Sequence, residues 1–266
     1  MTGTTSVPDH LSERKNLVRQ HFAVQARSHA HTPTLFAEKA QAMLDLARPE
    51  PGETVLDVAC GWGFVALAFA PFARSIIGVD LTPEMVDLAR TLARERDFSN
   101  VEYQRGDVEA LPFGTGTFDL VTCRAAFDHL GNPEKALGEM KRVLAPSGRI
   151  VLYEFVAPAL PEKAAFYNKI ERSRDPSHLR SLTVDEYRTL IRSCGLEERG
   201  RVVNLLKRDF EAWMSAAGAG EPEKQTLRSL LLDSIKGDRA GLAPRLQGGK
   251  LTFTHTCVAW LLTPGA

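Results

Sequence analysis

The stretch that decides the fold is Val55-Leu56-Asp57-Val58-Ala59-Cys60-Gly61-Trp62-Gly63. A short apolar run ends in the aspartate, a glycine turn follows, and an apolar helical segment begins at Phe64. Runs of this kind are typical of buried parallel strands. A glycine turn lets a ligand approach the backbone because no Cβ stands in the way. The stretch therefore predicts a strand, a turn and a helix, with a small molecule bound at the turn.

Two further aspartates end similar runs. They close the segments Ile76-Ile77-Gly78-Val79-Asp80 and Val101-Glu102-Tyr103-Gln104-Arg105-Gly106-Asp107. In doubly wound sheets, ligands bind at the carboxyl ends of the parallel strands. We therefore expect the carboxylates of Asp57, Asp80 and Asp107 to serve one ligand.

Length and composition favour one large α/β domain. The chain has 266 residues, of which 44% are hydrophobic and 25% are charged, which is enough for one elaborated domain or two small ones. Lys plus Arg and Asp plus Glu both number 33, so there is no general attraction to nucleic acid or to an anionic membrane. We expect a small-molecule substrate and no nucleic-acid partner. The oligomeric state is left open.

The cysteines and the hydropathy pattern predict a cytoplasmic protein. No C-x-x-C pair or metal-ligand spacing is present, so we expect reduced, buried thiols and no metal site. No apolar stretch approaches the ~18 residues of a membrane span, and the polar start does not resemble a secretion signal. We therefore expect a soluble, cytoplasmic protein without a membrane partner. The cysteines are Cys60, Cys123, Cys194 and Cys257.

Predicted strands and helices alternate between residues 53 and 155, which indicates a doubly wound, mostly parallel sheet. Two of the helices start at recognisable signals, Thr82 before Pro83 and Asn132 before Pro133. The strands are predicted near 54–58, 75–79, 101–104, 118–123 and 149–155, and the helices near 64–72, 83–96 and 132–145.

Further helices are predicted on both sides of this region. A disordered start over 1–8 precedes a helix with Leu17, Val18 and Phe22 at helical spacing, and a second helix follows over 33–47. Beyond the sheet, helices are predicted near 162–172, 183–193, 209–216 and 222–236, and strands near 198–205 and 251–262.

The glycine turn fits two classes of ligand. Gly61-x-Gly63-x-x-Ala66, with an acid 19 residues after Gly61, also matches the dinucleotide-binding pattern. A pyrophosphate beside Asp57 would be repelled by roughly 1 to 4 kcal/mol at about 4 Å. A cationic ligand would instead be attracted, and S-adenosylmethionine carries an ammonium and a sulfonium against one carboxylate. Charge therefore favours S-adenosylmethionine.

The three aspartates match the donors of S-adenosylmethionine in order. Asp57 can hold the amino-acid end through solvent or the turn, Asp80 the ribose diol, and Asp107 the adenine amine. The helix N-terminus beyond Gly63 is available for the ligand's carboxylate.

Four segments together resemble the class I S-adenosylmethionine-dependent methyltransferases. Two more, Phe127-Asp128-His129-Leu130 and Arg142-Val143-Leu144-Ala145-Pro146-Ser147-Gly148-Arg149, are similar to the ubiquinone/menaquinone-biosynthesis branch. The resemblance covers residues 52–155, and the segment 174–178 is similar to members of the same branch. The four segments are Val55-Leu56-Asp57-Val58-Ala59-Cys60-Gly61-Trp62-Gly63, Gly78-Val79-Asp80-Leu81-Thr82-Pro83-Glu84-Met85, Gly106-Asp107-Val108-Glu109-Ala110-Leu111-Pro112-Phe113 and Phe118-Asp119-Leu120-Val121-Thr122-Cys123-Arg124.

The resemblance implies a Rossmann-like methyltransferase fold. Its sheet has seven mostly parallel strands ending in an antiparallel hairpin, with an N-terminal helical preface and a helical insertion after the fifth strand. Residues 1–48 would form a helical segment on the cofactor site. Residues 49–266 would form the methyltransferase domain, with its core at 52–155 and substrate-covering helices and the last two strands at 156–266. The cofactor contacts implied are Asp57, Gly61, Gly63, Asp80, Leu81, Met85, Asp107, Val108 and Arg124.

Two positions depart from the family pattern. Phe64 stands where a third glycine is common, and Trp62 replaces a small polar residue, which would crowd the rim of the pocket. The Asn/Asp-Pro-Pro-Tyr/Phe motif of enzymes that act on exocyclic amines is also absent, because Arg124-Ala125-Ala126-Phe127 occupies its place. The resemblance therefore implies methylation of an oxygen or carbon atom of a small molecule.

Three polar residues are candidates for catalysis. His129 follows the fourth strand and is the first choice as general base, with His178 as the second and Asp128 as an orienting group. Two alternatives stay open. One is a member of the fold that catalyses cyclisation or rearrangement with S-adenosylmethionine as an electrostatic or structural cofactor, and the other is a dinucleotide-dependent oxidoreductase.

Overall fold

The computed structural model describes residues 10–29, 36–217 and 220–265. The predicted disorder over 1–8 lies outside these residues. The helices are α1 (His10–His29), α2 (Phe36–Ala47), α3 (Phe64–Phe69), η1 (Ala70–Phe72), α4 (Pro83–Glu95), η2 (Phe127–His129), α5 (Pro133–Val143), α6 (Pro161–Arg174), α7 (Val184–Ser193), α8 (Phe210–Ala217) and α9 (Glu221–Asp233). The strands are β1 (Thr54–Val58), β2 (Ser75–Asp80), β3 (Val101–Arg105), β4 (Phe118–Arg124), β5 (Leu144–Phe155), β6 (Leu196–Asp209), β7 (Arg245–Gln247) and β8 (Lys250–Pro264).

The main sheet has the predicted topology. Its order is β3-β2-β1-β4-β5-β8-β6, and β7 pairs with β8 at the side. The first five strands are parallel, and β8 pairs antiparallel with both β5 and β6. The expectation of a doubly wound sheet that ends in an antiparallel hairpin is confirmed. The eighth strand, β7, was not predicted, because three exposed residues carry no detectable alternation.

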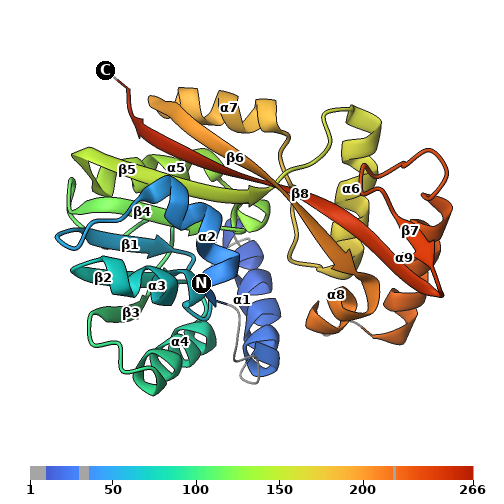
Figure 1. Ribbon diagram of the computed structural model, residues 1–266, viewed down its shortest axis with the longest axis horizontal. Coiled ribbons are helices and arrows are strands. Elements are labelled where there is room, and N and C mark those ends of the chain that lie inside the picture. Colours follow the sequence, from blue (N-terminus) through green and yellow to red (C-terminus); the bar gives the residue numbers. More distant parts are fainter. Residues whose placement is uncertain (1–9, 30–35, 218–219, 266) are drawn as a thin grey trace, which may run out of the picture.

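Helices cover both faces of the sheet, so the central strands carry apolar side chains on both faces (Figure 1). Val55 packs into one core with Val65 and Ile76, whereas its neighbour Leu56 packs into another with Val121. Successive side chains of a strand point to opposite faces, so one strand serves both cores. This explains why the β1 run shows no polar alternation.

Some predicted boundaries are wrong for local reasons. The helix predicted over 64–72 ends as an α-helix at Phe69 and continues as the 3-10 turn η1, because Pro71 has no N–H to donate to the α-helical ladder. The helix predicted to reach residue 145 ends at Val143, and β5 begins at Leu144. β6 and β8 are also longer at both ends than predicted.

The long strands β6 and β8 run out of the main sheet into a second lobe that contains α6, α8, α9 and β7 (Figure 1). This lobe has its own core, in which Tyr167, Phe210, Trp213 and Phe253 are buried. This second lobe therefore forms a wall beside the carboxyl ends of the parallel strands. The space between this wall and the sheet becomes part of the candidate site.

Candidate functional site

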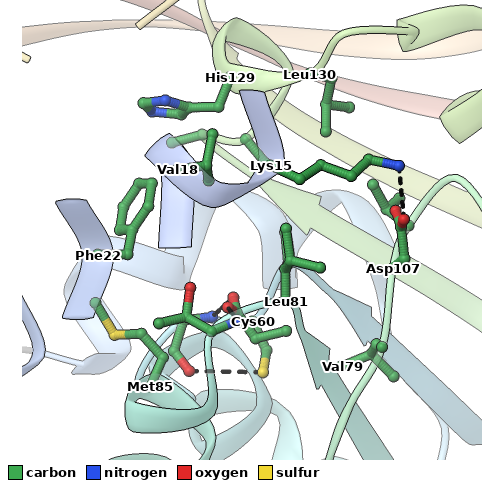
Figure 2. Close-up of a pocket in the computed structure, with 18 of the residues that line it drawn as sticks. Lys15, Val18, Phe22, Cys60, Val79, Leu81, Met85, Asp107, His129 and Leu130 are labelled. Atoms are coloured by element: carbon green, nitrogen blue, oxygen red, sulfur yellow. Dashed lines mark hydrogen bonds and ion pairs between the residues drawn. The ribbon is translucent and has the colours of Figure 1, made fainter. Parts of the chain in front are cut away.

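A first cavity lies at the carboxyl ends of β1, β2 and β3. Helix α1 crosses over it, with Lys15, Val18 and Phe22 on one side and Leu81 and Met85 opposite them (Figure 2). Side chains of the N-terminal helix therefore contribute directly to the wall of this cavity. The same cavity is lined by Gly61, Asp80, Asp107, Val108 and Arg124.

The glycine turn after β1 is tightly constrained. Gly63 has a φ of +84°, and a Cβ there would lie 2.4 Å from the hydroxyl oxygen of Tyr103. That hydroxyl donates to the Gly63 carbonyl over 3.1 Å. Gly63 is therefore needed for the close approach of Tyr103 beneath the turn, and it does not itself line the first cavity.

Two strand ends next to the cavity hold alanines in the left-handed region. Ala59, after β1, has a φ of +53°, and Ala125, after β4, has a φ of +51°. Non-glycine residues in this region cost about 1 to 3 kcal/mol each and gather at functional sites. Both alanines line the cavity, so the strain falls at the edge where a ligand would contact backbone.

Asp80 is organised as a hydrogen-bond acceptor. Its Oδ2 accepts from the Gly61 N–H over 2.8 Å, and its Oδ1 accepts from the Thr82 N–H over 2.8 Å. A carboxylate has about four acceptor positions, so both oxygens retain capacity for a ligand diol. Burial raises the pKa of Asp80 above its ordinary value.

Asp57 lies beneath the turn, outside the cavity wall. Its Oδ1 accepts from the Thr122 hydroxyl over 2.8 Å, and its Oδ2 accepts from the Ala66 N–H over 3.2 Å. Its side chain is 1% exposed, and burial raises its pKa to about 7. Of the two routes expected for Asp57, through solvent or through the turn, the geometry favours the turn.

Asp107 is partnered by the N-terminal helix. Its Oδ2 lies 2.7 Å from the Lys15 Nζ, which also contacts the Glu109 carboxylate at 2.8 Å (Figure 2). Its Oδ1 accepts from the Glu109 N–H over 2.9 Å. An adenine amine at this carboxylate would share it with Lys15. Sequence reasoning missed Lys15 because an isolated lysine on a polar helix carries no local signal.

A second, larger cavity of about 1000 Å³ lies between the sheet, α6, α8 and β6. It meets the first cavity at a small set of shared residues. The junction is where a group held in one cavity can contact a group held in the other. The shared residues are Phe22, Gln25, Trp62, Phe64, Arg124, Ala125 and His129.

Arg124 is fixed at this junction by two aromatic rings. Its guanidinium carbon lies 4.8 Å from the centre of the Phe64 ring and 5.1 Å from that of Tyr153. Its Nε is buried with no hydrogen-bond partner among the described residues, and burial lowers the pKa of the guanidinium. Phe64, which replaces a glycine of the family pattern, therefore supplies one face of the support for Arg124. The expectation that Arg124 contacts a ligand remains a prediction.

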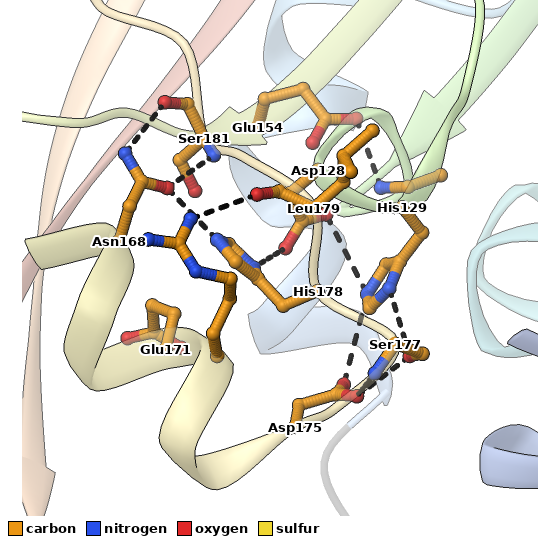
Figure 3. A network of polar contacts seen from close by, with 12 residues as sticks. Asp128, His129, Glu154, Asn168, Glu171, Asp175, Ser177, His178, Leu179 and Ser181 are labelled. Carbon is orange, nitrogen blue, oxygen red and sulfur yellow. Dashed lines mark hydrogen bonds and ion pairs between the residues drawn. The ribbon is translucent and has the colours of Figure 1, made fainter. Parts of the chain in front are cut away.

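His129 is oriented by a chain of hydrogen bonds from the loop after α6. The Ser177 hydroxyl donates to Asp175 Oδ1 over 2.6 Å and, having a single proton, must accept from His129 Nδ1 at 3.1 Å (Figure 3). His129 Nε2 then carries the lone pair of the neutral ring. Its nearest acidic oxygens, on Asp128 and Asp175, lie 3.7 Å and 3.9 Å away, too far for hydrogen bonds. The ring nitrogen without a hydrogen bond among the described residues, Nε2, therefore belongs to His129, which lies at the junction of the two cavities.

Asp175 anchors this chain as an ionised carboxylate. Burial alone would raise its pKa, but contacts from His21, His129 and Ser177 outweigh burial and lower it. His21 Nε2 lies 3.0 Å from Asp175 Oδ2. Asp175 and Ser177 were not predicted as site residues, although both stand in the segment 174–178 that the sequence singled out.

Both ring nitrogens of His178 lie within hydrogen-bonding distance of a partner. Asn168 Oδ1 accepts the Ser181 N–H over 2.7 Å and faces His178 Nε2 at 2.9 Å, so this nitrogen must donate. His178 Nδ1 lies 3.1 Å from Asp128 Oδ2 (Figure 3). Burial opposes the charge of Asp128, but its contacts with His129 and His178 outweigh burial and lower its pKa.

His178 stays a prediction as second candidate base, although Asn168 and Asp128 already face both of its ring nitrogens. The orienting role of Asp128 also stays a prediction; its carboxylate lies 3.1 Å from His178 Nδ1 and 3.7 Å from His129 Nε2.

Among the described residues, no group of three or more His, Cys, Asp or Glu side chains is arranged to hold a metal ion. Burial raises the pKa of the Cys60 and Cys123 thiols well above the ordinary value, so both are neutral. In the part of the chain that the structure describes, no helix combines the length and apolarity that a membrane crossing requires.

The fold and the cavity define a Rossmann-like methyltransferase class, and the comparisons name the family. A model described as a methyltransferase domain matches residues 56–152. The uncharacterized methyltransferase YcgJ of Bacillus subtilis is 36% identical over 189 residues, which cover 71% of this chain and 75% of that protein. The crystal structure of YcgJ superimposes with a TM-score of 0.80 at 29% identity, covering 86% of this chain and 99% of that one.

Two further proteins show how far the likeness extends. The ubiquinone/menaquinone biosynthesis C-methyltransferase UbiE of Citrifermentans bemidjiense is 41% identical over 111 residues, covering 40% of this chain and 47% of that protein. The [4+2]-cyclase SpnF matches with a TM-score of 0.63 at 18% identity, covering 86% of this chain and 82% of that one, which shows the shared fold alone.

The chain belongs to the methyltransferase family, and it is an S-adenosylmethionine-dependent methyltransferase. The cavity fits that cofactor. Carboxylate acceptors at Asp80 and Asp107 suit its hydroxyl and amine donors, and the Lys15 ammonium at the cavity wall is paired with Asp107 and Glu109. Together with the family, this favours S-adenosylmethionine over a dinucleotide.

Proposed function

We propose that this chain transfers the methyl group of S-adenosylmethionine to an oxygen or carbon atom of a small-molecule acceptor, with His129 as general base. One observation carries the proposal. The unprotonated nitrogen of His129 lies at the junction of the two cavities and is held there through Ser177 and Asp175. A base in this place can take a proton from an acceptor bound in the second cavity.

The first cavity is assigned to the cofactor. Asp80 would accept from the ribose hydroxyls and Asp107 from the adenine amine, while Leu81 and Met85 would pack against the base. Arg124 at the junction would attract a carboxylate of the ligand. When bound, the cofactor supplies a methyl group that its positively charged sulfur makes electrophilic.

His129 Nε2 would accept the proton of the acceptor hydroxyl or acidic carbon. The resulting imidazolium would carry an N–H toward Asp128 Oδ1, which is buried 3.7 Å away and has no hydrogen-bond partner among the described residues. An ionised carboxylate at that distance stabilises the imidazolium. Asp128 would therefore help His129 to keep the proton during transfer.

Burial of the junction would supply the remaining requirement. Phe22 of α1 packs edge-on against the His129 ring with 5.0 Å between ring centres, and Trp62 covers the neighbouring rim. Methyl transfer is an in-line displacement, so excluding water and aligning the nucleophile account for most of the task.

The test uses purified protein, S-adenosylmethionine labelled with carbon-13 in the methyl group, and extracts of small metabolites. We expect label in a product and S-adenosylhomocysteine in equal amount, and the chemical shift of the labelled carbon separates O-methyl from C-methyl products. Product without S-adenosylhomocysteine would instead identify a non-methylating reaction. A His129→Gln variant that binds S-adenosylhomocysteine normally but forms no product would assign the base.

A further inference from the structure

Within the described part of the chain, two arginines in the wall of the second cavity have no carboxylate at ion-pair distance. Arg174 ends α6 and Arg208 stands near the end of β6, and both line the cavity. Across residues 10–29, 36–217 and 220–265, neither guanidinium forms an ion pair, and the Nε of Arg208 is buried without a hydrogen-bond partner. A buried charge without a counter-charge costs free energy unless a ligand supplies the opposite charge.

The acidic groups nearby are already engaged with other partners. Glu171 Oε1 lies 2.8 Å from the Nε2 of the buried His255. Asp175 is bound by Ser177 and His21. The two arginines therefore face the cavity with their charges uncompensated by direct contact.

Aromatic rings hold both guanidiniums in position. The Arg174 guanidinium lies 4.7 Å from the centre of the Trp213 ring, and its Nε donates to the Trp213 carbonyl over 3.3 Å. The Arg208 guanidinium lies 5.7 Å from the centre of the Phe155 ring. Burial lowers the pKa of Arg208, and the positive charge of Arg174 adds to this effect. Stacking uses the faces of the guanidiniums and leaves their edge N–H donors for a ligand.

We propose that Arg174 and Arg208 together bind an oxyanion, a carboxylate or a phosphate, carried by the acceptor. The proposal rests on the proposed function, because it assigns the second cavity to the acceptor. Guanidinium forks recognise planar or tetrahedral oxyanions by paired hydrogen bonds. The acceptor would thus carry an oxyanion at one end, an apolar body against Phe155 and Trp213, and its nucleophilic atom at His129.

The experiment measures binding of three probes to the full chain by calorimetry, with and without S-adenosylhomocysteine. The probes are phenylacetate, phenyl phosphate and the neutral phenylacetamide. We expect at least one anion to bind 10-fold or more tightly than the amide. Arg174→Met and Arg208→Met should each weaken the anion about 10-fold and leave the amide unchanged. The tighter anion shows whether the group is a carboxylate or a phosphate.

Arg201→Met is the matched control, because Arg201 stands on β6, pairs with Glu198 and lines neither cavity. It should leave all three affinities unchanged. Equal binding of anions and amide, or equal losses in the Arg201 and Arg208 variants, would overturn the proposal. Failure of S-adenosylhomocysteine to bind would count against the proposed function instead, and the anion comparison remains decisive without it.

Discussion

The two cavities are built in different ways. The first is made mainly of strand ends and turns of the sheet, where backbone N–H groups position carboxylates such as Asp80, and α1 crosses over it. The second is assembled from side chains of α1, α6, α8, β6 and β8, which are distant in sequence. The comparison teaches that a cofactor shared by many enzymes is held by the fold itself. Under the proposed function, the acceptor is recognised by the additions to that fold.

The largest expected effect tests whether chemistry takes place at the boundary between the cavities. His129→Ala should lower kcat by about 10²-fold to 10⁴-fold, because general-base assistance is worth that much. Cofactor affinity should change little, and the wild-type rate should rise with pH because only the neutral ring accepts a proton. Turnover kinetics and calorimetry measure both quantities. A variant with nearly full kcat would leave positioning alone as the source of catalysis.

The next effect concerns the buried support of the first cavity. The folded state raises the Asp57 pKa from 3.8 to about 7, so it holds the proton more tightly than the unfolded chain. Stability is therefore highest at low pH on this account, and it falls between about pH 4 and pH 7 by at most about 4 kcal/mol. Urea unfolding should show that the free energy of unfolding of wild type falls relative to that of Asp57→Asn as the pH rises through this range.

Asp119→Asn is the control for that experiment. The Thr54 N–H and hydroxyl hydrogen bonds lower the Asp119 pKa, so its contribution is lost only in acid, below its ordinary range. The wild-type and Asp119→Asn curves should stay parallel between about pH 5 and pH 8. A parallel course for Asp57→Asn as well would refute the assignment of a raised pKa to Asp57.

A third effect separates cofactor contacts from acceptor contacts. Asp80→Ala should weaken S-adenosylmethionine binding by about 1.5 to 3 kcal/mol, because a charge-assisted bidentate contact is lost. Asp87→Ala, on the exposed side of α4, should leave the affinity unchanged. Calorimetry on the two folded variants is sufficient. Equal affinities would end the ribose assignment of Asp80.

The smallest effect tests a positioning residue of the junction. Ser177→Ala removes the hydroxyl between Asp175 and His129 and should lower kcat about 10-fold with KM unchanged, since one orienting hydrogen bond is lost. Ser173→Ala, whose hydroxyl donates only to the Lys169 carbonyl, is the matched control. A purely structural role of Ser177 would instead appear as a loss of thermal stability with kcat preserved.

Much of the site could be predicted because it follows the chain. The aspartates after β1, β2 and β3 come to one edge by strand topology, so Asp80 and Asp107 line one cavity as expected. Asp57 shows the limit of this reasoning. The same pattern that put it at the strand end could not show that Thr122 and Ala66 hold it beneath the turn.

The hydrogen-bond partners of the two candidate histidines come from distant parts of the sequence. The sequence ranks His129 above His178 because His129 follows the fourth strand, but it does not show the hydrogen-bond partners of either ring. Ser177 leaves one nitrogen of His129 free, whereas Asn168 and Asp128 occupy both nitrogens of His178. The contacts that distinguish the two histidines therefore join residues 48 and 50 positions apart.

The sequence by itself determined the doubly wound sheet, the glycine turn and the cofactor class. These depend on strand periodicity, on backbone freedom at glycine and on the charge of residues that adjacent strands bring together. Only the tertiary structure shows which partners the two histidine rings have, and where the guanidiniums of Arg174 and Arg208 meet. Both depend on side chains brought together by the long strands β6 and β8 and the loop after α6, and such long-range contacts leave no periodic signal in the chain.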